Sequence, residues 1–349
     1  MHGKYQMSVR LGYACICMDL KEKDIYSTRT LTLGSIVKKG IDEAKRLALE
    51  NVRDLAKIIQ HNELLGIRFF RITSNLFPHM ENPKLLMGEK GKNLTYNIEF
   101  AREELASVGK IARKFGHRLT MHPGQYVQIG SKDERIVEQS LRDITLHAEI
   151  LAAMGMTPEL GSVIIIHGGG TFGDKPAAIE RFKRNFKRLD PAAARYVALE
   201  NDEFQYSIGD LLPICEELSI PLCVDFFHHL VMMSRSTAKG TIADVNVYSR
   251  EVFSRVMLTW KVRGIKPKCH WSQQREGARD GSHSDCVDEI PRAILELAYE
   301  NSLDIMLEVK HKDRCVLKIY DKHFLRNVSS YKDSDGSKTM RVEWYLQNF

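Results

Sequence analysis

The sequence is poor in cysteine, and its seven thiols are badly spaced for cross-links or metal clusters. The number is odd, and none of the cysteines shows the C-x-x-C spacing that is typical of structural zinc sites. We therefore expect neither a disulfide framework nor a closed structural zinc site, and the free thiols indicate a reducing compartment.

Long apolar runs are also missing. No stretch approaches the roughly 20 residues that a membrane-spanning helix needs, and the opening residues MHGKYQMSVR lack the apolar core of a secretion signal. We expect a protein of the cytoplasm, associated with the nucleoid, or of the nucleus in a compartmented cell. It is not expected to be secreted or to contact a membrane.

The sequence has almost no excess of charge of either sign. The 349 residues carry 51 Lys and Arg against 45 Asp and Glu, so the net charge is only +6. A small basic excess permits a polyanionic partner without demanding one. The hydrophobic fraction of 43% is that of an ordinary globular chain, long enough for one large domain or two small ones.

Eight short apolar runs alternate with segments of helical periodicity along most of the chain. The runs cover residues 9–15, 68–73, 117–122, 162–168, 196–201, 222–228, 267–272 and 304–309. Each is rich in β-branched, aromatic or other apolar residues over the usual length of a strand. The alternation predicts a single α/β domain, a (β/α)8 TIM barrel over residues 1–314, followed by a C-terminal extension of unknown role over residues 315–349. A doubly wound open sheet is the alternative, because strand count alone does not close a barrel.

Side chains that suit metal binding lie at the ends of six of these runs. They are His122, His167, Glu200, Asp225 with His228, His270 and Glu308. A further histidine, His283, follows the seventh run. In a parallel barrel all these ends lie on one face, where the βα loops build the active site.

One histidine at a strand end is most often a hydrogen-bonded structural residue. A whole group of imidazoles and carboxylates in one barrel mouth would be costly unless something paired them. Divalent metals are the natural partners, because these ligand types suit Zn²⁺, Mn²⁺ and Fe²⁺. The set exceeds what one ion can coordinate, so we expect two or three ions. Such a site favours hydrolysis of phosphate esters, and a divalent-metal sugar isomerase on the same type of barrel is the alternative.

Seven motifs, in this order, resemble those of the UV damage endonucleases. They are HPGQY (122–126), IIHGGG (165–170), LENDE (199–203), VDFFHH (224–229), KPKCHWSQ (266–273), SH (282–283) and MLEVKHKD (306–313). The similarity covers nearly the whole chain and extends more distantly to the endonuclease IV and xylose isomerase barrels. It implies a DNA repair enzyme that nicks the phosphodiester bond immediately 5′ to UV photoproducts, abasic sites and other distorting lesions. The attacking group would be a metal-activated hydroxide.

The resemblance also implies three divalent ions, Mn²⁺ or Zn²⁺, and no organic cofactor. The ligands that it implies are the set already found from the strand ends, namely His122, His167, Glu200, Asp225, His228, His270, His283 and Glu308. Glu200, Glu308 and His270 are expected to be catalytic, together with Lys268. In the family a lysine at the position of Lys268 lies beside the metals and can carry a carboxyl modification.

Contacts to DNA are implied by other positions of the same motifs. Gln125 and Tyr126 resemble the pair that enters the duplex at the lesion, and Tyr13 resembles a tyrosine that lines the pocket for the damaged base. A lesion that is already poorly stacked costs less to extrude than an intact base, which makes selection by distortion possible.

Candidate phosphate contacts are basic residues in or near the expected βα loops. They are Arg71, Lys175, Arg275 and Arg279. The expected partner is damaged double-stranded DNA, acted on by a monomer. The remaining alternative is a non-catalytic protein that binds damaged DNA, and the intact ligand set argues against it.

Overall fold

A computed structural model describes residues 9–86, 94–238, 244–332 and 338–347. In this part of the chain, the eight predicted runs form eight parallel strands. The strands are β1 (Leu11–Ala14), β2 (Phe69–Ile72), β3 (Arg118–Met121), β4 (Ile164–His167), β5 (Val197–Glu200), β6 (Leu222–Cys223), β7 (Lys268–Trp271) and β8 (Asp304–Leu307). Each of them lies inside its predicted range.

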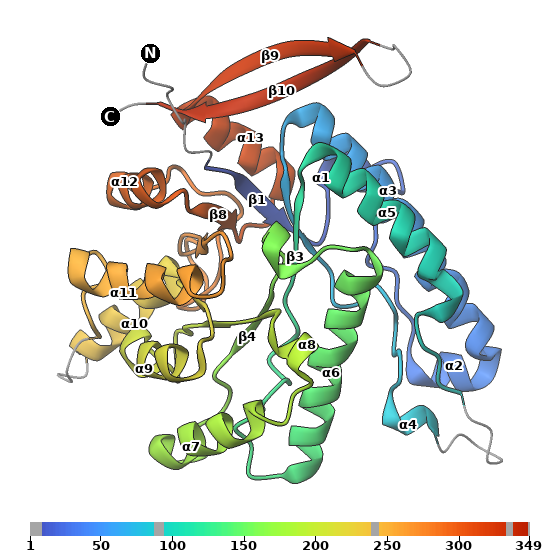
Figure 1. Ribbon diagram of the computed structural model, residues 1–349, viewed down its shortest axis with the longest axis horizontal. Helices are drawn as coiled ribbons and strands as arrows, with labels where there is room; N and C mark the ends of the chain where they lie inside the picture. The colour runs from blue at the N-terminus through green and yellow to red at the C-terminus, as the bar shows by residue number, and fades with distance from the viewer. Residues whose placement is uncertain (1–8, 87–93, 239–243, 333–337, 348–349) are drawn as a thin grey trace.

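The strands are hydrogen-bonded in the order β6-β5-β4-β3-β2-β1-β8-β7. The two ends of this sheet meet, because the amide of His270 donates to the carbonyl oxygen of Val224 at 2.8 Å. Asp225 and His270 also form a parallel bridge. The sheet therefore closes nearly completely into a barrel, which confirms the predicted (β/α)8 fold over the open doubly wound sheet (Figure 1).

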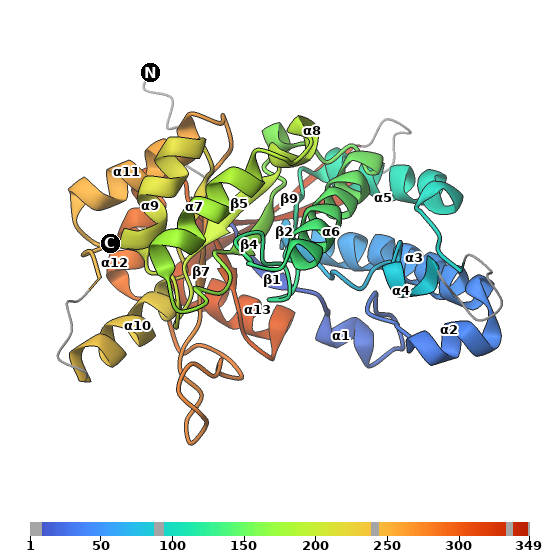
Figure 2. The ribbon, with the colours of Figure 1, turned by 90° about the horizontal axis from the view of Figure 1, so that it is seen from below.

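Helices surround the barrel (Figures 1 and 2). They are α1 (Met18–Lys21), α2 (Leu33–Lys39), α3 (Ile41–Leu65), α4 (Pro83–Leu86), α5 (Arg102–Phe115), α6 (Glu134–Ala153), α7 (Lys175–Phe186), α8 (Pro191–Ala194), α9 (Ile208–Leu218), α10 (Phe226–Ala238), α11 (Arg250–Lys261), α12 (Arg292–Asn301) and α13 (Lys312–His323). Short 3-10 turns occur at Glu99–Ala101 and Pro158–Leu160. Long helices end where the sequence supplies a residue for the left-handed conformation, as α3 does at Gly66 (φ 74°).

The sixth strand is much shorter than predicted. β6 ends at Cys223, and α10 begins at Phe226. Asp225 therefore lies in the connection, and His228 lies in the first turn of α10 rather than on a strand. The apolar run VDFFHH is compatible with a strand and with the start of a helix, because the sequence patterns of a buried strand and a buried helix do not differ over so few residues.

A charged cluster closes the opposite end of the barrel, where the strands begin. The fully buried carboxylate of Asp304 contacts the guanidinium groups of Arg10 at 2.8 Å and Arg118 at 3.0 Å. The ammonium of Lys266 contacts the same carboxylate at 2.5 Å. The charge of the buried Arg118 is thus paired, as burial of an ion requires.

The predicted boundary at residue 315 lies inside α13, the helix that follows β8, and the rest of the C-terminal part is a hairpin of two antiparallel strands, β9 (Phe324–Lys332) and β10 (Lys338–Leu346). The Trp344 ring stacks on Tyr320 with centroids 4.8 Å apart, and its indole N–H donates to the carbonyl oxygen of Leu65 at 2.9 Å. These contacts hold the hairpin against the strand-start end of the barrel. Residues 333–337 and 348–349 of the extension lie outside the described residues.

One expectation about cysteine is corrected. Cys286, in the loop after β7, and Cys315, on α13, form a disulfide with their Cα atoms 5.4 Å apart. Their separation of 29 residues gives no sign of pairing in the sequence, because only the fold brings the loop onto the helix. None of the helices in the described ranges combines the length and the apolar character needed to cross a membrane.

Candidate metal centre

The strand ends bring the predicted imidazoles and carboxylates to one mouth of the barrel. His122 follows β3, His167 ends β4, Glu200 ends β5 and Glu308 follows β8. His270 lies inside β7, next to Asp225 across the closing bridge. These six residues come from six neighbouring strands or the loops that follow them, and His228 on α10 is the seventh.

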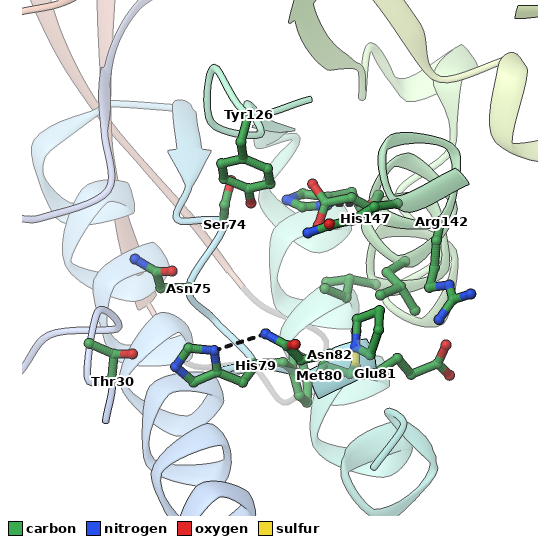
Figure 3. A pocket seen from close by; sticks show the side chains of 16 residues that line it. Thr30, Ser74, Asn75, His79, Met80, Glu81, Asn82, Tyr126, Arg142 and His147 are labelled. Carbon is green, nitrogen blue, oxygen red and sulfur yellow. Dashed lines mark hydrogen bonds and ion pairs between the residues drawn. The ribbon is translucent and has the colours of Figure 1, made fainter. Parts of the chain in front are cut away.

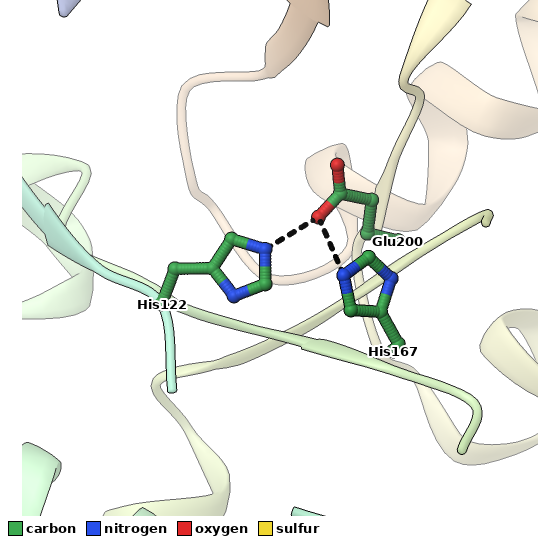
Figure 4. Close-up of side chains that lie close together, drawn as sticks. All are labelled: His122, His167 and Glu200. Carbon is green, nitrogen blue, oxygen red and sulfur yellow. Dashed lines mark ion pairs between the residues drawn. The ribbon is translucent and has the colours of Figure 1, made fainter. Parts of the chain in front are cut away.

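Glu200 lies at the centre of this cluster and is fully buried. One oxygen, Oε2, is 2.9 Å from His122 Nε2 and 3.8 Å from His167 Nε2 (Figure 4). The other oxygen, Oε1, is 2.6 Å from His270 Nδ1 and 3.9 Å from His228 Nδ1. One carboxylate therefore faces four of the predicted imidazoles.

The second half of the cluster surrounds His270 and His228. His270 Nδ1 is 3.2 Å from Glu308 Oε1 and 3.9 Å from Asp225 Oδ2. His228 Nδ1 is 3.6 Å from the same oxygen of Asp225. His283 joins from the loop after β7, with Nδ1 3.9 Å from Glu308 Oε2. The structure thus brings all eight predicted ligands together.

Burial and mutual charge set the protonation of the carboxylates. Burial alone would raise the pKa of Glu200, but the imidazoles of His270 and His167 bring it well below its usual range. Burial likewise opposes ionisation of Glu308, and the Arg71 guanidinium lowers the pKa of Glu308 well below its usual range. Burial raises the pKa of Asp225 to about 6, with the neighbouring carboxylates adding to the effect. All three carboxylates are therefore mainly ionised at neutral pH.

The histidines split into neutral and charged groups. Burial lowers the pKa of His270 to about 4 and also lowers the pKa of His122. His228 behaves in the opposite way: burial would lower its pKa, but the Asp225 carboxylate and its neighbours raise it to about 10. In the absence of a cation, His228 supplies the positive charge that this acidic corner needs.

The orientation of the imidazoles fits a metal centre. Nδ1 of His122, His228 and His283 hydrogen-bonds to the backbone carbonyl oxygen of Pro123, Asn201 and Glu308, at 3.0, 3.0 and 2.9 Å respectively. In each of these rings Nε2 is then the nitrogen that can bind an ion, and a carbonyl on the other nitrogen is the usual second partner of a metal-bound histidine.

Bare acceptor atoms support the same interpretation. Asp225 Oδ2 and His167 Nδ1 are buried and have no hydrogen-bond partner among the described residues. The ligand atoms of His122, His167 and Glu200 lie within 4.8 Å of one another, and so do those of Glu200, Asp225 and His270. Leaving buried carboxylate oxygens without partners is costly, so the residues present fit divalent cations. Glu200 belongs to both groups.

Two buried cations border the cluster. Lys268 Nζ contacts His270 Nε2, and burial lowers the pKa of this lysine. Arg71 pairs with Glu308 and is only 15% exposed. Arg71, which the sequence suggests as a phosphate contact, balances a predicted ligand with its guanidinium in this structure.

Sequence reasoning did not single out two further residues of the site. The Asn201 side chain donates to the Asp225 carbonyl at 2.9 Å and accepts from the Asp225 amide at 2.8 Å, which fixes the short connection after β6. Glu203 Oε2 is 3.7 Å from His228 Nε2. Both belong to the motif LENDE, which was the only available signal for them.

The loop after β3 presents Gln125 and Tyr126 to solvent. Tyr126 is 56% exposed and stands at the rim of a cavity of about 320 Å³, above Ser74 and His147 (Figure 3). Burial raises the pKa of the phenol to about 12, and the nearby Asp143 carboxylate adds to this effect. Ser74 donates to the carbonyl oxygen of His122 at 2.8 Å, so the cavity adjoins the cluster.

Tyr13 does not face the mouth. It is fully buried, its hydroxyl donates to Asn62 Oδ1 at 2.6 Å, and its ring packs edge-on against Phe70. A base cannot reach it in this structure. Strand β1 ends one residue later, and its alternation points this side chain toward α3.

The remaining basic candidates lie near the mouth. Lys175, the first residue of α7, pairs with Asp210 at 2.7 Å and is 38% exposed. Arg275 is 47% exposed and lies 3.7 Å from Asp285. Both side chains are themselves exposed, so the phosphates of a bound duplex can approach them.

Comparison with known proteins gives one consistent result. Residues 9–344 match the family described as UV-endonuclease UvdE. A relative from Acanthamoeba polyphaga mimivirus is 42% identical over 344 residues, covering 98% of this chain and 99% of its own length. The UV-damage endonuclease of Schizosaccharomyces pombe is 36% identical over 91% of this chain, which spans about half (51%) of that longer protein. The crystal structure of SacUVDE superposes with a TM-score of 0.73 at 26% identity, over 89% of this chain and 96% of the other.

Proposed function

Because this chain belongs to the UV-endonuclease UvdE family, we propose that it cuts damaged double-stranded DNA immediately 5′ to the lesion. The substrates would be UV photoproducts, abasic sites and other distorting damage. The observation that carries this proposal is the buried cluster at the barrel mouth, where one Asp225 oxygen has no hydrogen-bond partner and backbone carbonyls orient the imidazoles. Hydrolysis of a phosphodiester is the chemistry that such a cluster serves best when cations are present.

Each residue of the cluster has a distinct part in this proposal. His122 and His167 would hold a cation on one side of Glu200, while Asp225, His228, His270, His283 and Glu308 would hold cations on the other. Divalent ions bound there, three in number and Mn²⁺ or Zn²⁺, would supply Lewis acidity toward the phosphate and a nucleophile at neutral pH. Glu200 is the shared carboxylate, because its two oxygens face different histidines.

Lys268 and Arg71 would act close to the reacting group. Lys268 contacts His270 Nε2 and is fully desolvated, so it would fix the ring and add positive charge beneath the phosphate. Modification of Lys268 by a carboxyl group would reverse that charge and add a ligand. Arg71 would position Glu308 through their ion pair.

Lesion recognition is assigned to the loop that follows the ligand His122. Gln125 and Tyr126 are exposed and lie only three and four residues from that ligand. The Tyr126 ring would fill the gap that extruded nucleotides leave, and the amide of Gln125 would hydrogen-bond the bases opposite. Lys175, Arg275 and Arg279 would contact phosphates, so affinity should fall steeply with salt.

The test is incision of one duplex oligonucleotide with and without a single cyclobutane dimer, in Mn²⁺ and in EDTA. A cut at the bond directly 5′ to the dimer, dependent on Mn²⁺ and absent from the intact duplex, is expected. Binding of damaged DNA without incision would indicate a binding protein instead. Activity on ketoses without DNA binding would indicate a sugar isomerase.

A further inference from the structure

The loop between β5 and α9 presents an exposed aromatic ring beside the candidate metal centre. Phe204 is 50% exposed, and the adjacent Glu203 reaches His228. Phe204 also lines a cavity of about 230 Å³ together with Gln125 and His167. An exposed phenylalanine alone is ordinary. This ring, however, shares one hollow with a predicted metal ligand and with a residue of the lesion-contacting loop.

The loop holds this ring in a fixed place. The carboxylate of Asp202 accepts hydrogen bonds from the amides of Phe204 at 2.8 Å and Tyr206 at 3.1 Å, and also from the amide of Gln205. The Asp202 amide in turn donates to the Tyr206 carbonyl oxygen at 3.0 Å. A ligand that meets Phe204 therefore does not have to order the loop, which lowers the entropic cost of binding.

Two arginines surround the ring. The guanidinium carbon of Arg235 is 4.1 Å from the ring centroid, and that of Arg279 is 5.9 Å away. Arg235 is held by the Glu203 carbonyl oxygen at 2.7 Å and by Asp280 at 2.8 Å. Arg279 is exposed on the loop after β7. Arg235 covers one face of the ring at 4.1 Å, so the ring suits a flat π-system that stacks on its other face and carries negative charge for the arginines.

We propose that Phe204 is a stacking platform for a nucleobase of the distorted DNA, with Arg235 and Arg279 facing the adjoining phosphates. The inference rests on the proposed function. The loops after β3 and β5 flank the loop after β4, so Tyr126 and Phe204 would contact the DNA on two sides of the metal centre. A base that loses its neighbour when a lesion is extruded would regain a stacking partner on Phe204. Every base has a π-face, so this contact selects distortion rather than sequence.

The test measures binding of lesion-containing duplex by fluorescence anisotropy in EDTA, where no incision occurs. Phe204→Ala should weaken binding about 5- to 100-fold, the usual loss of one base–aromatic stack. Phe204→Trp should bind within about twofold of wild type, because an indole stacks as well as a phenyl ring. A 2-aminopurine placed at each position flanking the lesion should be quenched at one position by wild type and by Phe204→Trp, and not by Phe204→Ala.

Tyr299→Ala is the matched control, because it truncates another ring that is 41% exposed, on the outer helix α12. It should bind like wild type. Suppose that Phe204→Ala binds the duplex and quenches 2-aminopurine as wild type does, while the wild-type protein cuts damaged DNA. That result would overturn this inference and leave the proposed function standing. Wild-type protein that neither binds nor cuts damaged DNA would overturn both.

Discussion

Glu200 shows how much one residue decides in this site. It is fully buried, and its two oxygens face His122 and His167 on one side and His270 and His228 on the other. No arginine or lysine pairs with it in the described chain, unlike Glu308, which has Arg71. Cations that bind here would therefore provide the main compensation for burying this charge.

We expect Glu200→Gln to remove at least one bound divalent ion and to reduce incision by more than about 100-fold. Mutation of a residue that only hydrogen-bonds to a metal ligand already lowers metal affinity or activity about 10- to 100-fold, and mutation of a direct ligand should lower it more. Metal content by elemental analysis and incision rate on dimer-containing duplex would be measured together. Glu216→Gln, which disrupts a surface pair with Arg255, should leave both unchanged. Full metal content and full activity in Glu200→Gln would contradict the assignment.

Tyr126 carries a separate prediction. Tyr126→Ala should lower affinity for dimer-containing duplex about 5- to 100-fold through loss of one stack, and it should not change metal content. Tyr126→Phe keeps the stacking face and loses only the hydroxyl contact with Asp143, so it should bind nearly as wild type. Equal losses in both variants would show that the hydroxyl, and not the ring, makes the contact.

At the scale of elements, the strand ends could be predicted because parallel strands place their carboxyl ends on one face. This reasoning located His122, His167, Glu200 and Glu308 directly. It failed for β6, where the chain leaves the sheet at Cys223 and a helix presents His228. Tyr13, whose role only the family resemblance implies, is buried against Asn62 and Phe70, and a run of four buried residues in β1 does not indicate which ones face the mouth.

Features that depend on contacts between distant segments were not predictable. Nothing in the spacing of Cys286 and Cys315 indicates that the loop after β7 lies on α13. The pairing of Arg71 with Glu308 joins residues 237 positions apart. Arg71 lies within β2 rather than in a βα loop, and only the closed barrel shows that its partner is a carboxylate of the site.

The hairpin β9–β10 provides a prediction at this scale. Trp344 stacks on Tyr320 and donates to the Leu65 carbonyl oxygen at the end of the barrel opposite the metal centre. Trp344→Ala should lower the free energy of unfolding by about 1–3 kcal/mol, and its metal content and incision rate at 25 °C should equal those of wild type. Urea unfolding and the incision assay would check this. A large loss of incision in the folded variant would assign the hairpin a role in DNA binding.

At the scale of the whole molecule, the barrel carries charge clusters at both ends. At the mouth the carboxylates face mainly imidazoles, and one oxygen of Asp225 has no hydrogen-bond partner, whereas the opposite end pairs Asp304 with three basic side chains. The first arrangement is incomplete without cations, and the second is complete within the chain. This contrast separates a site from a structural cluster more clearly than residue types do.

Asp304→Asn tests the structural cluster. Burial would raise the pKa of Asp304, but Arg10, Lys266 and Arg118 hold it far below its usual range. Its stabilising effect is therefore complete above the pKa of an unfolded aspartate, about 3.9, and is lost as the pH falls toward the folded value. At pH 7 the substitution should lower the free energy of unfolding by about 3–5 kcal/mol, because it leaves Arg118 buried without a counter-charge.

Urea unfolding from pH 7 to pH 3 would check this, with the difference between variant and wild type shrinking below about pH 4. Asp321→Asn, at an exposed position of α13, serves as the control and should change little. A difference for Asp304→Asn that grows on acidification would contradict the direction of its pKa shift.

The account depends most on divalent ions bound among the imidazoles and carboxylates of the barrel mouth. The most direct measurement is an anomalous difference map from crystals equilibrated with Mn²⁺. We predict peaks beside Glu200, one facing His122 and His167 and at least one facing Asp225, His228 and Glu308. A map with no peak among these residues, from crystals of protein that still cuts damaged DNA, would contradict the account.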